Sequence, residues 1–309
     1  MPCLITGVGG FLPGNPITNF ALEKKLNTSD EWISSRTGIA QRFFSDVSAL
    51  EMARHASLEA ISHAKIDKNS IDLVLVSTCT PDGAFPSISS SLAGALEIKD
   101  CPSLDINAVC SGFVYGMHFG SAMISSGKSK RMLLVATERM SSLLSMEDRS
   151  TDVLFGDGAA AVIIEKSENA LFESLVGTNG ELSSILKTLE DKNRQIIKMN
   201  GGEVYKYAVQ KMQESSEAVL ESKNLKMEDV DFFIPHQANA RIIESVGNKM
   251  NIPEKKLVLT VRDHANTSSA SIPLALNYLK EKNMFSKKTI LTCAVGAGMT
   301  YGAAIFQTK

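Results

Sequence analysis

The chain alternates between strand-like and helix-like segments along its whole length, a pattern typical of layered α/β proteins. Segments with the periodicity of amphipathic helices lie between short apolar runs, for example at 52–64 and 205–221. The apolar runs predict buried strands at 73–77, 132–136, 160–164, 232–235 and 290–294. We therefore expect a core built from layers of sheet and helix.

The pattern of the first half recurs in the second half, displaced by about half the chain length. Residues 71–76 and 230–234 each place an aspartate at the start of a strand that follows a helix and a short polar turn. A later pair of strands begins with basic residues, at 130–135 and 287–292, and each half closes on a strand of small residues. Any α/β chain shows a few such matches, but their common order favours a duplicated unit.

Two uncharged stretches strengthen this correspondence. One is the helix that follows Cys110, and the other, at 265–279, lies at the equivalent place in the second half. Paired apolar helices would pack together at the centre, so Cys110 and Asn266, at their starts, are expected to lie near one another. We expect an N-terminal half at 1–170 and a C-terminal half at 171–309.

Charge and composition exclude several classes of protein. The chain of 309 residues carries 32 basic against 34 acidic residues, which argues against nucleic-acid binding through a globally positive surface. No basic segment precedes the apolar stretch near the N-terminus, so we expect no secretory signal and a cytoplasmic location. The uncharged run 106–127 is long enough to span a membrane, but its glycines and polar residues favour a buried helix of a soluble core.

Cys110 is the candidate nucleophile among five cysteines, none of which has C-x-x-C spacing. It follows a strand expected at 103–108 and opens a helix, so the helix dipole is expected to lower the pKa of its thiol. Neither a metal site nor a disulfide is expected. A lone cysteine in an apolar segment is more often inert core, which is the interpretation given to Cys3, Cys79, Cys101 and Cys293.

His236 is the candidate histidine. It comes directly after the strand 232–235 and is expected to open the next helix. The ends of strands are where α/β proteins place working residues. Solvent or packing roles are expected for the other histidines, His55, His63, His118 and His264.

Three segments that hold these candidates resemble the active-site motifs of a known family. They are NAVCSGF at 107–113, PHQANARII at 235–243 and HANTSSAS at 264–271. They are similar to the motifs of β-ketoacyl-[acyl-carrier-protein] synthase III, which belongs to the thiolase-like condensing superfamily. The resemblance covers essentially the whole chain, because further segments fit in family order, at 28–39, 148–150, 155–159 and 296–302.

The resemblance implies a thiolase-like α/β fold, with duplicated βαβαβαββ halves in five αβαβα layers. It implies an acyltransferase that initiates fatty-acid synthesis, in which Cys110 takes an acyl group from a short acyl-CoA. Decarboxylative Claisen condensation with malonyl-acyl carrier protein then gives 3-oxoacyl-acyl carrier protein. His236 and Asn266 would stabilise the enolate, and the backbone N–H groups of Cys110 and Ala297 would form a second oxyanion hole. No cofactor is implied, because the CoA thioester and phosphopantetheine are substrates.

Binding roles also carry over by resemblance. Trp32 and Arg149 resemble a pair that sandwiches the CoA adenine, and Arg36 resembles a contact to a CoA phosphate. Phe85 matches a residue that reaches across a homodimer to close the acyl pocket of the partner. A core aromatic remains an alternative for Trp32.

The acidic carrier protein would be received by a second group of residues. For the two basic residues, Arg241 and Lys206, the alternative is a charge that only contacts solvent, as exposed charges on helices usually do. Two residues depart from the family pattern. Gly202 stands where the family commonly has an asparagine that contacts the pantetheine arm, and Asn248 stands where the docking face for the carrier often has a lysine. The group comprises Arg241, Lys206, Gln237, Ala238, Asn239 and Ala240.

Three alternative functions use the same residue types. A related acyl-CoA-dependent priming synthase or acyltransferase of polyketide or specialised metabolism would use the same Cys-His-Asn site, and malonyl decarboxylation would separate the two. Papain-like proteases share the order Cys, His, Asn, but this chain lacks the C-G-S-C-W context of their nucleophile. A non-catalytic scaffold that binds the carrier has no support while all three residues are intact.

Overall fold

The structure is a computed structural model that describes residues 3–309. Its main sheet has nine strands, which fall into two sets. The first set follows the spatial order β1 (Cys3–Phe11), β7 (Gly158–Lys166), β6 (Arg131–Glu138), β4 (Leu73–Ser77) and β5 (Ser103–Ile106). The second set follows the order β8 (Phe172–Thr178), β13 (Thr300–Thr308), β12 (Thr289–Gly296) and β11 (Phe232–Pro235).

The two sets have the same pairing pattern. In each set the first three strands pair antiparallel, and the next neighbour pairs parallel. A parallel bridge between Phe233 and Leu257 lies beside β11 in the place that β5 takes beside β4. The sets join where Leu4 and Ile5 of β1 pair with the end of β13. This pattern confirms the duplicated α/β architecture expected from the sequence.

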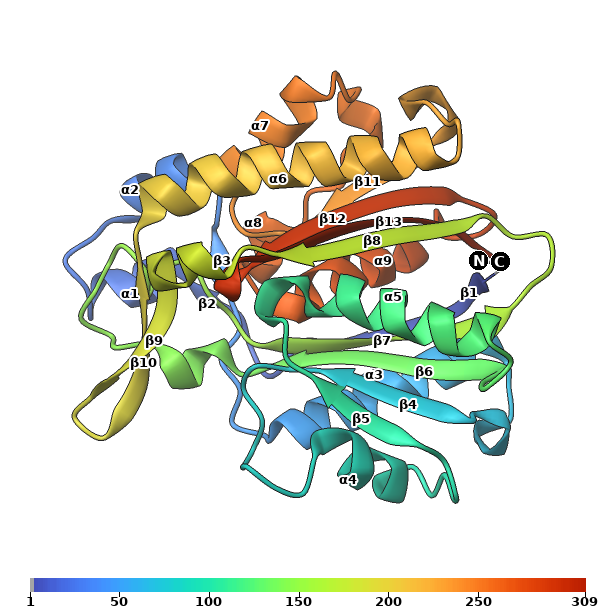
Figure 1. Ribbon diagram of the computed structural model, residues 1–309. Coiled ribbons are helices and arrows are strands. Elements are labelled where there is room, and N and C mark those ends of the chain that lie inside the picture. Colours follow the sequence, from blue (N-terminus) through green and yellow to red (C-terminus); the bar gives the residue numbers. More distant parts are fainter. Residues whose placement is uncertain (1–2) are drawn as a thin grey trace.

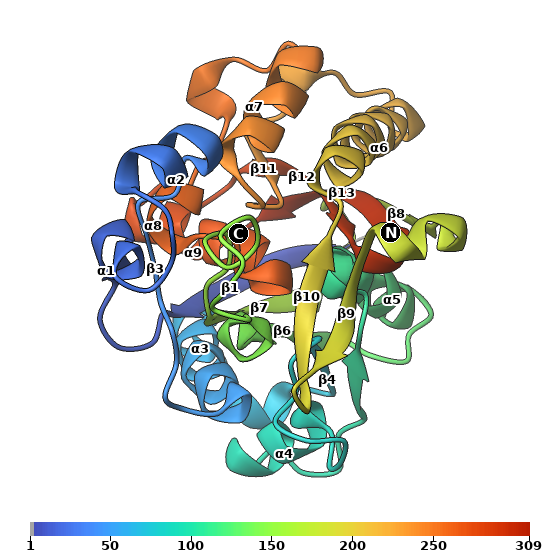
Figure 2. The same ribbon diagram turned by 90° about the vertical axis from the view of Figure 1, so that its left-hand side faces the viewer.

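Helices lie between the two sets of strands and on both outer faces (Figures 1 and 2). In the middle layer, α5 (Gly112–Ser125) and α9 (Ser271–Glu281) share one apolar core with strands of both sets. The first set is covered by α3 (Ala49–Ala64) and α4 (Ile88–Ala95), and the second by α6 (Gly201–Ser222) and α7 (Ala240–Lys249). The layers therefore follow the order αβαβα, as expected.

The larger part of the uncharged run 106–127 forms helix α5, which buries one face in the central core and leaves Phe119 exposed. A Cβ atom added at Gly116 would lie 2.5 Å from Leu134 Cδ1 on β6, so the glycine lets helix and strand approach closely. No helix within residues 3–309 combines the length and the apolar character needed to cross a membrane.

Smaller elements gather at one end of the layered body, where the parallel strands of both sets have their carboxyl ends (Figure 2). This end is where α/β proteins place their ligands. The elements are β2 (Ile17–Thr18), α1 (Asn19–Glu23), α2 (Asp30–Thr37), β3 (Gln41–Arg42), β9 (Leu186–Asp191), β10 (Arg194–Met199) and α8 (Val261–His264).

Arg42 anchors the N-terminal part of this end. Its guanidinium is fully buried and donates to Asn19 Oδ1 at 2.7 Å and to the Val153 carbonyl at 2.9 Å. Asn19 Nδ2 in turn donates to Asp30 Oδ1, at the start of α2, at 2.9 Å. Burial lowers the pKa of Arg42 to about 10, so the side chain stays charged at neutral pH.

The strands and helices expected from the sequence are present, with small changes at their ends. The strands expected at 73–77 and 232–235 have the observed bounds. The strand expected at 103–108 ends at Ile106, because the chain turns at Val109, whose φ is 48°. The division at residue 170 stays a prediction, and it falls between the end of β7 and the start of β8.

Candidate active site

Cys110 lies in a single 3-10 turn, η2 (Val109–Ser111), between β5 and the first residue of α5. Ser111 Oγ donates to Thr300 Oγ1 at 2.7 Å, which ties this turn to the first residue of β13. Cys110 is only 6% exposed. The turn therefore holds a buried thiol at the amino end of the central helix.

The expectation that the pKa of this thiol is lowered was wrong. Burial raises the pKa of Cys110 to about 12, and the nearby Glu138 carboxylate acts in the same direction. A hydrogen bond with the Ser268 hydroxyl lowers the pKa, but by less than burial raises it. Burial disfavours the charged thiolate. Cys110 is therefore a protonated thiol before the reaction and must lose its proton when it attacks.

His236 lies in a loop after β11, and its backbone N–H donates to the Cys293 carbonyl at 2.8 Å. The expectation that it opens the next helix was wrong, because α7 starts at Ala240 and Asn239 caps it by accepting the Ile242 N–H at 3.0 Å. Residues 236–239 thus form a connection that turns the chain from the strand into the helix.

A neighbouring serine fixes the tautomer of His236. His236 Nδ1 lies 2.7 Å from Ser271 Oγ, which also accepts the Gln237 N–H at 3.3 Å. We assign the Ser271 hydroxyl as the donor to Nδ1, which leaves the ring proton on Nε2. Burial lowers the pKa of His236 to about 3, so the ring is a neutral N–H donor at physiological pH.

Asn266 is held on both sides of its backbone. Its N–H donates to the Leu154 carbonyl at 2.9 Å, and its carbonyl accepts the Gly156 N–H at 3.1 Å. Its Oδ1 accepts the Ser268 N–H at 2.9 Å. This bond fixes the amide orientation and leaves the Nδ2–H groups as donors.

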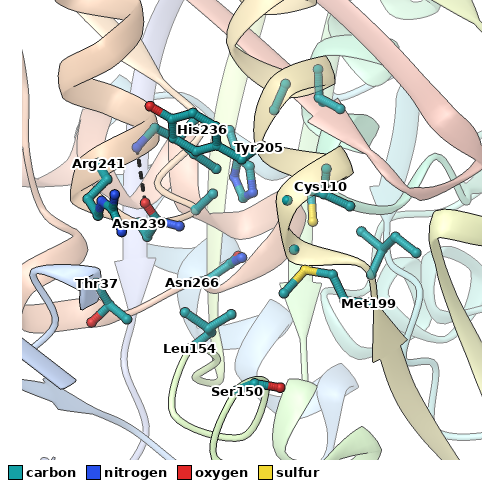
Figure 3. A pocket seen from close by; sticks show the side chains of 18 of the residues that line it. Thr37, Cys110, Ser150, Leu154, Met199, Tyr205, His236, Asn239, Arg241 and Asn266 are labelled. Atoms are coloured by element: carbon teal, nitrogen blue, oxygen red, sulfur yellow. Dashed lines mark hydrogen bonds between the residues drawn. The ribbon is translucent and has the colours of Figure 1, made fainter. Parts of the chain in front are cut away.

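The structure brings the three candidates together, as Figure 3 shows. Cys110, His236 and Asn266 line one cavity of about 650 Å³. Met199 and Tyr205 form part of its apolar wall. The cavity thus joins a thiol to two neutral N–H donors, a set that suits nucleophilic attack on a thioester and stabilisation of an oxyanion.

The Gly296–Ala297 backbone comes close to the nucleophile. A Cβ atom at Gly296 would lie 2.7 Å from the Ala108 carbonyl and 2.9 Å from the Cys110 nitrogen. Glycine is therefore required for this approach. It places Ala297, the expected second oxyanion-hole residue, on a segment that abuts the Cys110 backbone.

A second, smaller chamber of about 200 Å³ also reaches Cys110. The turn at Val109 and Cys110, together with Ala297, forms one part of its lining, and the β9–β10 hairpin contributes another. Its remaining wall is largely apolar, with Cys79, Met140, Leu143, Leu186 and Ile197. No signal in the sequence predicts this wall, because its members come from segments far apart in the chain.

The residues expected at the CoA adenine touch one another. Arg149 Cζ lies 4.9 Å from the centroid of the Trp32 ring, and Arg149 Nη1 donates to the Asn27 carbonyl at 2.9 Å. A base inserted between them needs about 7 Å, twice an ordinary contact distance, so the pair must separate to sandwich it. Trp32 and Arg36 line the large cavity.

Five of the six residues expected to receive a carrier protein are at least partly exposed, and they divide into two groups. Arg241 and Lys206 are exposed and line the large cavity, and Ala238, Asn239 and Ala240 are partly exposed.

Gln237 belongs to neither group, because its side chain is 1% exposed. Its Nε2 donates to the Pro235 carbonyl at 2.7 Å, and its Oε1 accepts the Thr260 N–H at 2.8 Å. These backbone bonds give Gln237 an internal role, so its side chain cannot contact a docking protein.

Phe85 is 89% exposed, and it lines neither of the two cavities that reach Cys110. Phe85 lies in the loop before α4. Its expected role in the acyl pocket of a partner subunit stays a prediction.

Two residues near the site had no role assigned from the sequence. Ser271 orients His236, although it lies in the motif at 264–271. Glu138 is fully buried at the last position of β6, and its place at a strand end is a signal that could have identified it. Across residues 3–309 no group of three or more His, Cys, Asp or Glu side chains is arranged to hold a metal ion.

Comparisons with known families and proteins agree over the whole chain. Residues 104–180 match the family described as 3-Oxoacyl-[acyl-carrier-protein (ACP)] synthase III, and residues 220–308 match the family described as its C-terminal part. Proteins from Rickettsia felis and Rickettsia bellii named beta-ketoacyl-[acyl-carrier-protein] synthase III are each 43% identical, over 99% of this chain and 100% of theirs.

Solved structures of the same kind superpose closely. The 3-oxoacyl-[acyl-carrier-protein] synthase III from Aquifex aeolicus VF5 has a TM-score of 0.95 and 39% identity, covering 99% of each chain. The priming β-ketosynthase from the R1128 polyketide pathway also has a TM-score of 0.95, with 31% identity, covering 99% of this chain and 96% of its own.

Proposed function

Because the chain belongs to the 3-oxoacyl-[acyl-carrier-protein] synthase III family, we propose that Cys110, His236 and Asn266 are its catalytic residues. The protein is an acyltransferase, the condensing enzyme that initiates fatty-acid synthesis. One observation carries the assignment of the three residues. A buried thiol, a ring Nε2–H and a side-chain amide line the same cavity, and a hydrogen bond orients both the ring and the amide.

In the first half-reaction, Cys110 attacks the carbonyl carbon of a short acyl-CoA. The Cys110 thiol loses its proton as the Sγ–C bond forms, the bond from carbon to the CoA sulfur breaks, and CoA takes up a proton and leaves as a thiol. The backbone N–H groups of Cys110 and Ala297 are placed to stabilise the oxyanion of the tetrahedral intermediate. The acyl chain then occupies the chamber of about 200 Å³, which lies beside Cys110.

In the second half-reaction, the malonyl-phosphopantetheine arm of malonyl-acyl carrier protein occupies the large cavity, and the malonyl group loses carbon dioxide. The electron pair of the broken C–C bond becomes a thioester enolate, whose oxygen accepts hydrogen bonds from His236 Nε2 and Asn266 Nδ2. Both donors are neutral and buried in a site of low polarity. Their hydrogen bonds to the enolate oxygen therefore become stronger as negative charge develops on that oxygen. The enolate carbon then attacks the acyl-enzyme, and Cys110 leaves as the 3-oxoacyl product forms.

Basic side chains at the cavity mouth suit the anionic substrates. We propose Arg36, Trp32 and Arg149 for CoA, with the last two parting to admit the adenine. Arg241 and Lys206 would meet the acidic carrier protein, with Ala238, Asn239 and Ala240 beside them. The proposed chemistry needs neither metal nor cofactor.

We also propose that the protein is a homodimer. Leu104 on β5 is 57% exposed, and within residues 3–309 this strand pairs on one side only, with β4. Phe119 on the neighbouring α5 is 51% exposed. An unpaired edge beside exposed apolar residues is a site for association, and a second copy would bring its Phe85 towards the acyl chamber. Sedimentation of wild type and Leu104→Asp tests this, with a dimer expected for the first and a monomer for the second.

A cytoplasmic location fits this chemistry, because a nucleophilic thiol must stay reduced. A polyketide-priming role is less well supported, since the solved priming β-ketosynthase shares 31% identity while the beta-ketoacyl-[acyl-carrier-protein] synthase III of Rickettsia felis shares 43%.

Intact-mass spectrometry tests the assignment of the nucleophile. Incubation with acetyl-CoA should add one acyl mass to the wild type and none to Cys110→Ala, whereas Cys293→Ala, which alters another buried cysteine, should still be labelled. A series of straight and branched acyl-CoAs would identify the preferred starter. If no member of the series labels the protein, the priming role is wrong.

A further inference from the structure

Glu138 is a buried carboxyl group with no basic partner. It is 0% exposed, and in the part of the chain that the structure describes no lysine or arginine forms an ion pair with it. The guanidinium of the adjacent Arg139 turns away to Asp82 and to the Ser45 carbonyl. Burying an unpaired charge is costly, so a role in the site is a better explanation than stability.

The Glu138 carboxylate accepts hydrogen bonds from two segments that are distant in sequence. Its Oε2 accepts the Cys79 N–H at 3.1 Å and the Thr80 hydroxyl at 2.7 Å, both from the loop after β4. Its Oε1 accepts the Ser269 hydroxyl at 2.6 Å and the Ser268 hydroxyl at 3.2 Å, both from one turn of the second half. Glu138 therefore connects a loop of the first half to a turn of the second half.

The turn that Glu138 contacts, η7 (Ser268–Ala270), packs against β6 and begins in an unfavourable backbone conformation. The φ of Ser268 is 49°, in the left-handed region that residues with a side chain rarely adopt. Such a conformation persists only where the surrounding contacts determine it. The Ser268 hydroxyl lies 3.2 Å from Glu138 Oε1 and 3.9 Å from the Cys79 sulfur, so the carboxylate is the nearer of these two groups.

The same turn directs a backbone donor at the side chain of Asn266. The Ser268 N–H donates to Asn266 Oδ1 at 2.9 Å, which leaves the Nδ2–H groups free to act as donors in the large cavity (Figure 3). The backbone of Asn266 is held separately, through Leu154 and Gly156. The backbone bonds therefore fix the position of Asn266 in the chain, and the Ser268 N–H fixes the orientation of its amide.

We propose that Glu138 positions the Asn266 amide for decarboxylation by holding Ser268 in its left-handed conformation. This inference rests on the proposed role of Asn266 as a donor to the enolate oxygen. The carboxylate accepts the hydroxyls of Ser268 and Ser269, the turn keeps its shape, and the Ser268 N–H keeps hold of Asn266 Oδ1. Glu138 touches no substrate and exchanges no proton, so it is a positioning residue.

Two substitutions of Glu138 test this role in the full chain. Glu138→Met keeps a long side chain but offers only a weak thioether acceptor to the two serine hydroxyls. Release of carbon dioxide from malonyl-acyl carrier protein should slow by about 100-fold, the loss expected when one oxyanion donor no longer acts. Glu138→Gln keeps an amide that bonds to both hydroxyls, so its loss should stay within about tenfold.

Acylation of Cys110 provides a readout that a general structural role would not leave intact. Attack on acetyl-CoA does not use the Asn266 amide, so Glu138→Met should be acylated at a rate within a few-fold of the wild type. The charge of Glu138 raises the pKa of Cys110, so its removal does not disfavour the thiolate. Intact-mass spectrometry over a single turnover measures this rate.

Hydrogen exchange at the Ser268 amide tests the turn without any substrate. Ser268 is 0% exposed and its N–H is hydrogen-bonded, so this amide should exchange slowly in the wild type. In Glu138→Met it should exchange at least about tenfold faster. The amides of α7, in the second half, should keep their wild-type rates, whereas a general loss of stability would accelerate both. Fragmentation mass spectrometry of the peptides locates the change.

Two substitutions of Ser268 keep the test available if Glu138→Met fails to fold. Ser268→Ala and Ser268→Gly both remove the hydroxyl that Glu138 accepts, but glycine adopts a positive φ without a steric cost. Decarboxylation by Ser268→Ala should fall by about tenfold, and Ser268→Gly should lose clearly less. Equal losses would show that the left-handed conformation does not need to be held.

The outcomes separate the positioning role from the proposed function. Unchanged decarboxylation in Glu138→Met, an equal loss of acylation and decarboxylation, a Glu138→Gln variant as slow as Glu138→Met, or an unchanged Ser268 exchange rate would each overturn the positioning role. A wild type that releases no carbon dioxide, but whose Ser268 amide follows the expected exchange pattern, would overturn the proposed function and leave the hold of Glu138 on the turn standing.

Discussion

The two halves of the molecule share one arrangement of strands and helices but contribute different groups to the active site. The last strand position of β6 holds Glu138, and the equivalent position of β12 holds Gly296. In the first half a carboxylate at that position accepts hydrogen bonds beside the nucleophile. In the second half the lack of a side chain lets the backbone approach the same nucleophile. The comparison indicates that the two copies of a duplicated fold can contribute to one reaction in different ways through the residue at the end of equivalent strands.

The segments inserted after the first strand of each half also differ. The first half inserts residues 12–48, which hold α2 with Trp32 and Arg36. The second half inserts residues 179–200, whose hairpin lines the small chamber. The framework positions the catalytic groups, while the two insertions form the binding surfaces.

The largest effect is expected where the second half meets the nucleophile. Gly296→Val should reduce acylation by about 100-fold or more, because its side chain would collide with the Ala108 carbonyl and the Cys110 nitrogen and displace the Ala297 N–H. Single-turnover acylation with acetyl-CoA measures this loss. Gly94→Ala is the control, since its Cβ would meet no atom within 4 Å. Normal acylation by Gly296→Val would show that the close approach is not needed.

A smaller effect is expected where the first insertion is anchored. Arg42→Met should lower the free energy of unfolding by about 3 kcal/mol, because it leaves Asn19 Oδ1 and the Val153 carbonyl without their buried donor. Denaturant unfolding measures this change. Arg54→Met is the control, since Arg54 is partly exposed and bonds to Glu51 on its own helix. Equal stabilities would mean that Arg42 does not anchor the insertion.

The sequence predicted the strands and the three active-site residues well, but it did not predict the electrostatics of the site. Periodicity placed the strands because a buried strand is continuously apolar, and the motifs located Cys110, His236 and Asn266. The raised pKa of Cys110 could not be predicted, because it arises from burial and from a glutamate on another strand. The burial of Gln237 and the contact between Trp32 and Arg149 were missed for the same reason, since both depend on segments distant in sequence.

The free energy of unfolding should depend on pH because of His236, the buried histidine of the second half. The pKa of His236 is about 3 in the folded protein against an ordinary value of 6.5. Below pH 6.5 the unfolded chain binds the extra proton, so the stability contribution is full above this pH and is lost as pH falls towards 3. Between pH 8 and pH 5 the wild type should lose about 2 kcal/mol more than His236→Phe.

Unfolding of both proteins at the two pH values measures the difference. His55→Phe, which alters an exposed histidine, should retain the pH dependence of the wild type. A His236→Phe variant as sensitive to pH as the wild type would contradict a neutral buried ring.

The smallest effect is expected from the residue that orients His236. Ser271→Ala should slow malonyl decarboxylation by about tenfold, because one hydrogen bond of about 1.4 kcal/mol no longer fixes the ring tautomer. Acylation by acetyl-CoA should stay close to the wild-type rate. Carbon dioxide release from malonyl-acyl carrier protein measures the first rate, and an equal loss in both half-reactions would mean that Ser271 supports the whole site.

The division of chemistry between the halves is tested most directly by measuring both half-reactions in His236→Ala and Asn266→Ala. Each variant should gain one acetyl mass at Cys110 from acetyl-CoA at a rate near that of the wild type. Each should release carbon dioxide from malonyl-acyl carrier protein at least 100-fold more slowly, since it lacks a donor to the enolate oxygen. Acylation and decarboxylation that fall together in both variants would contradict the account.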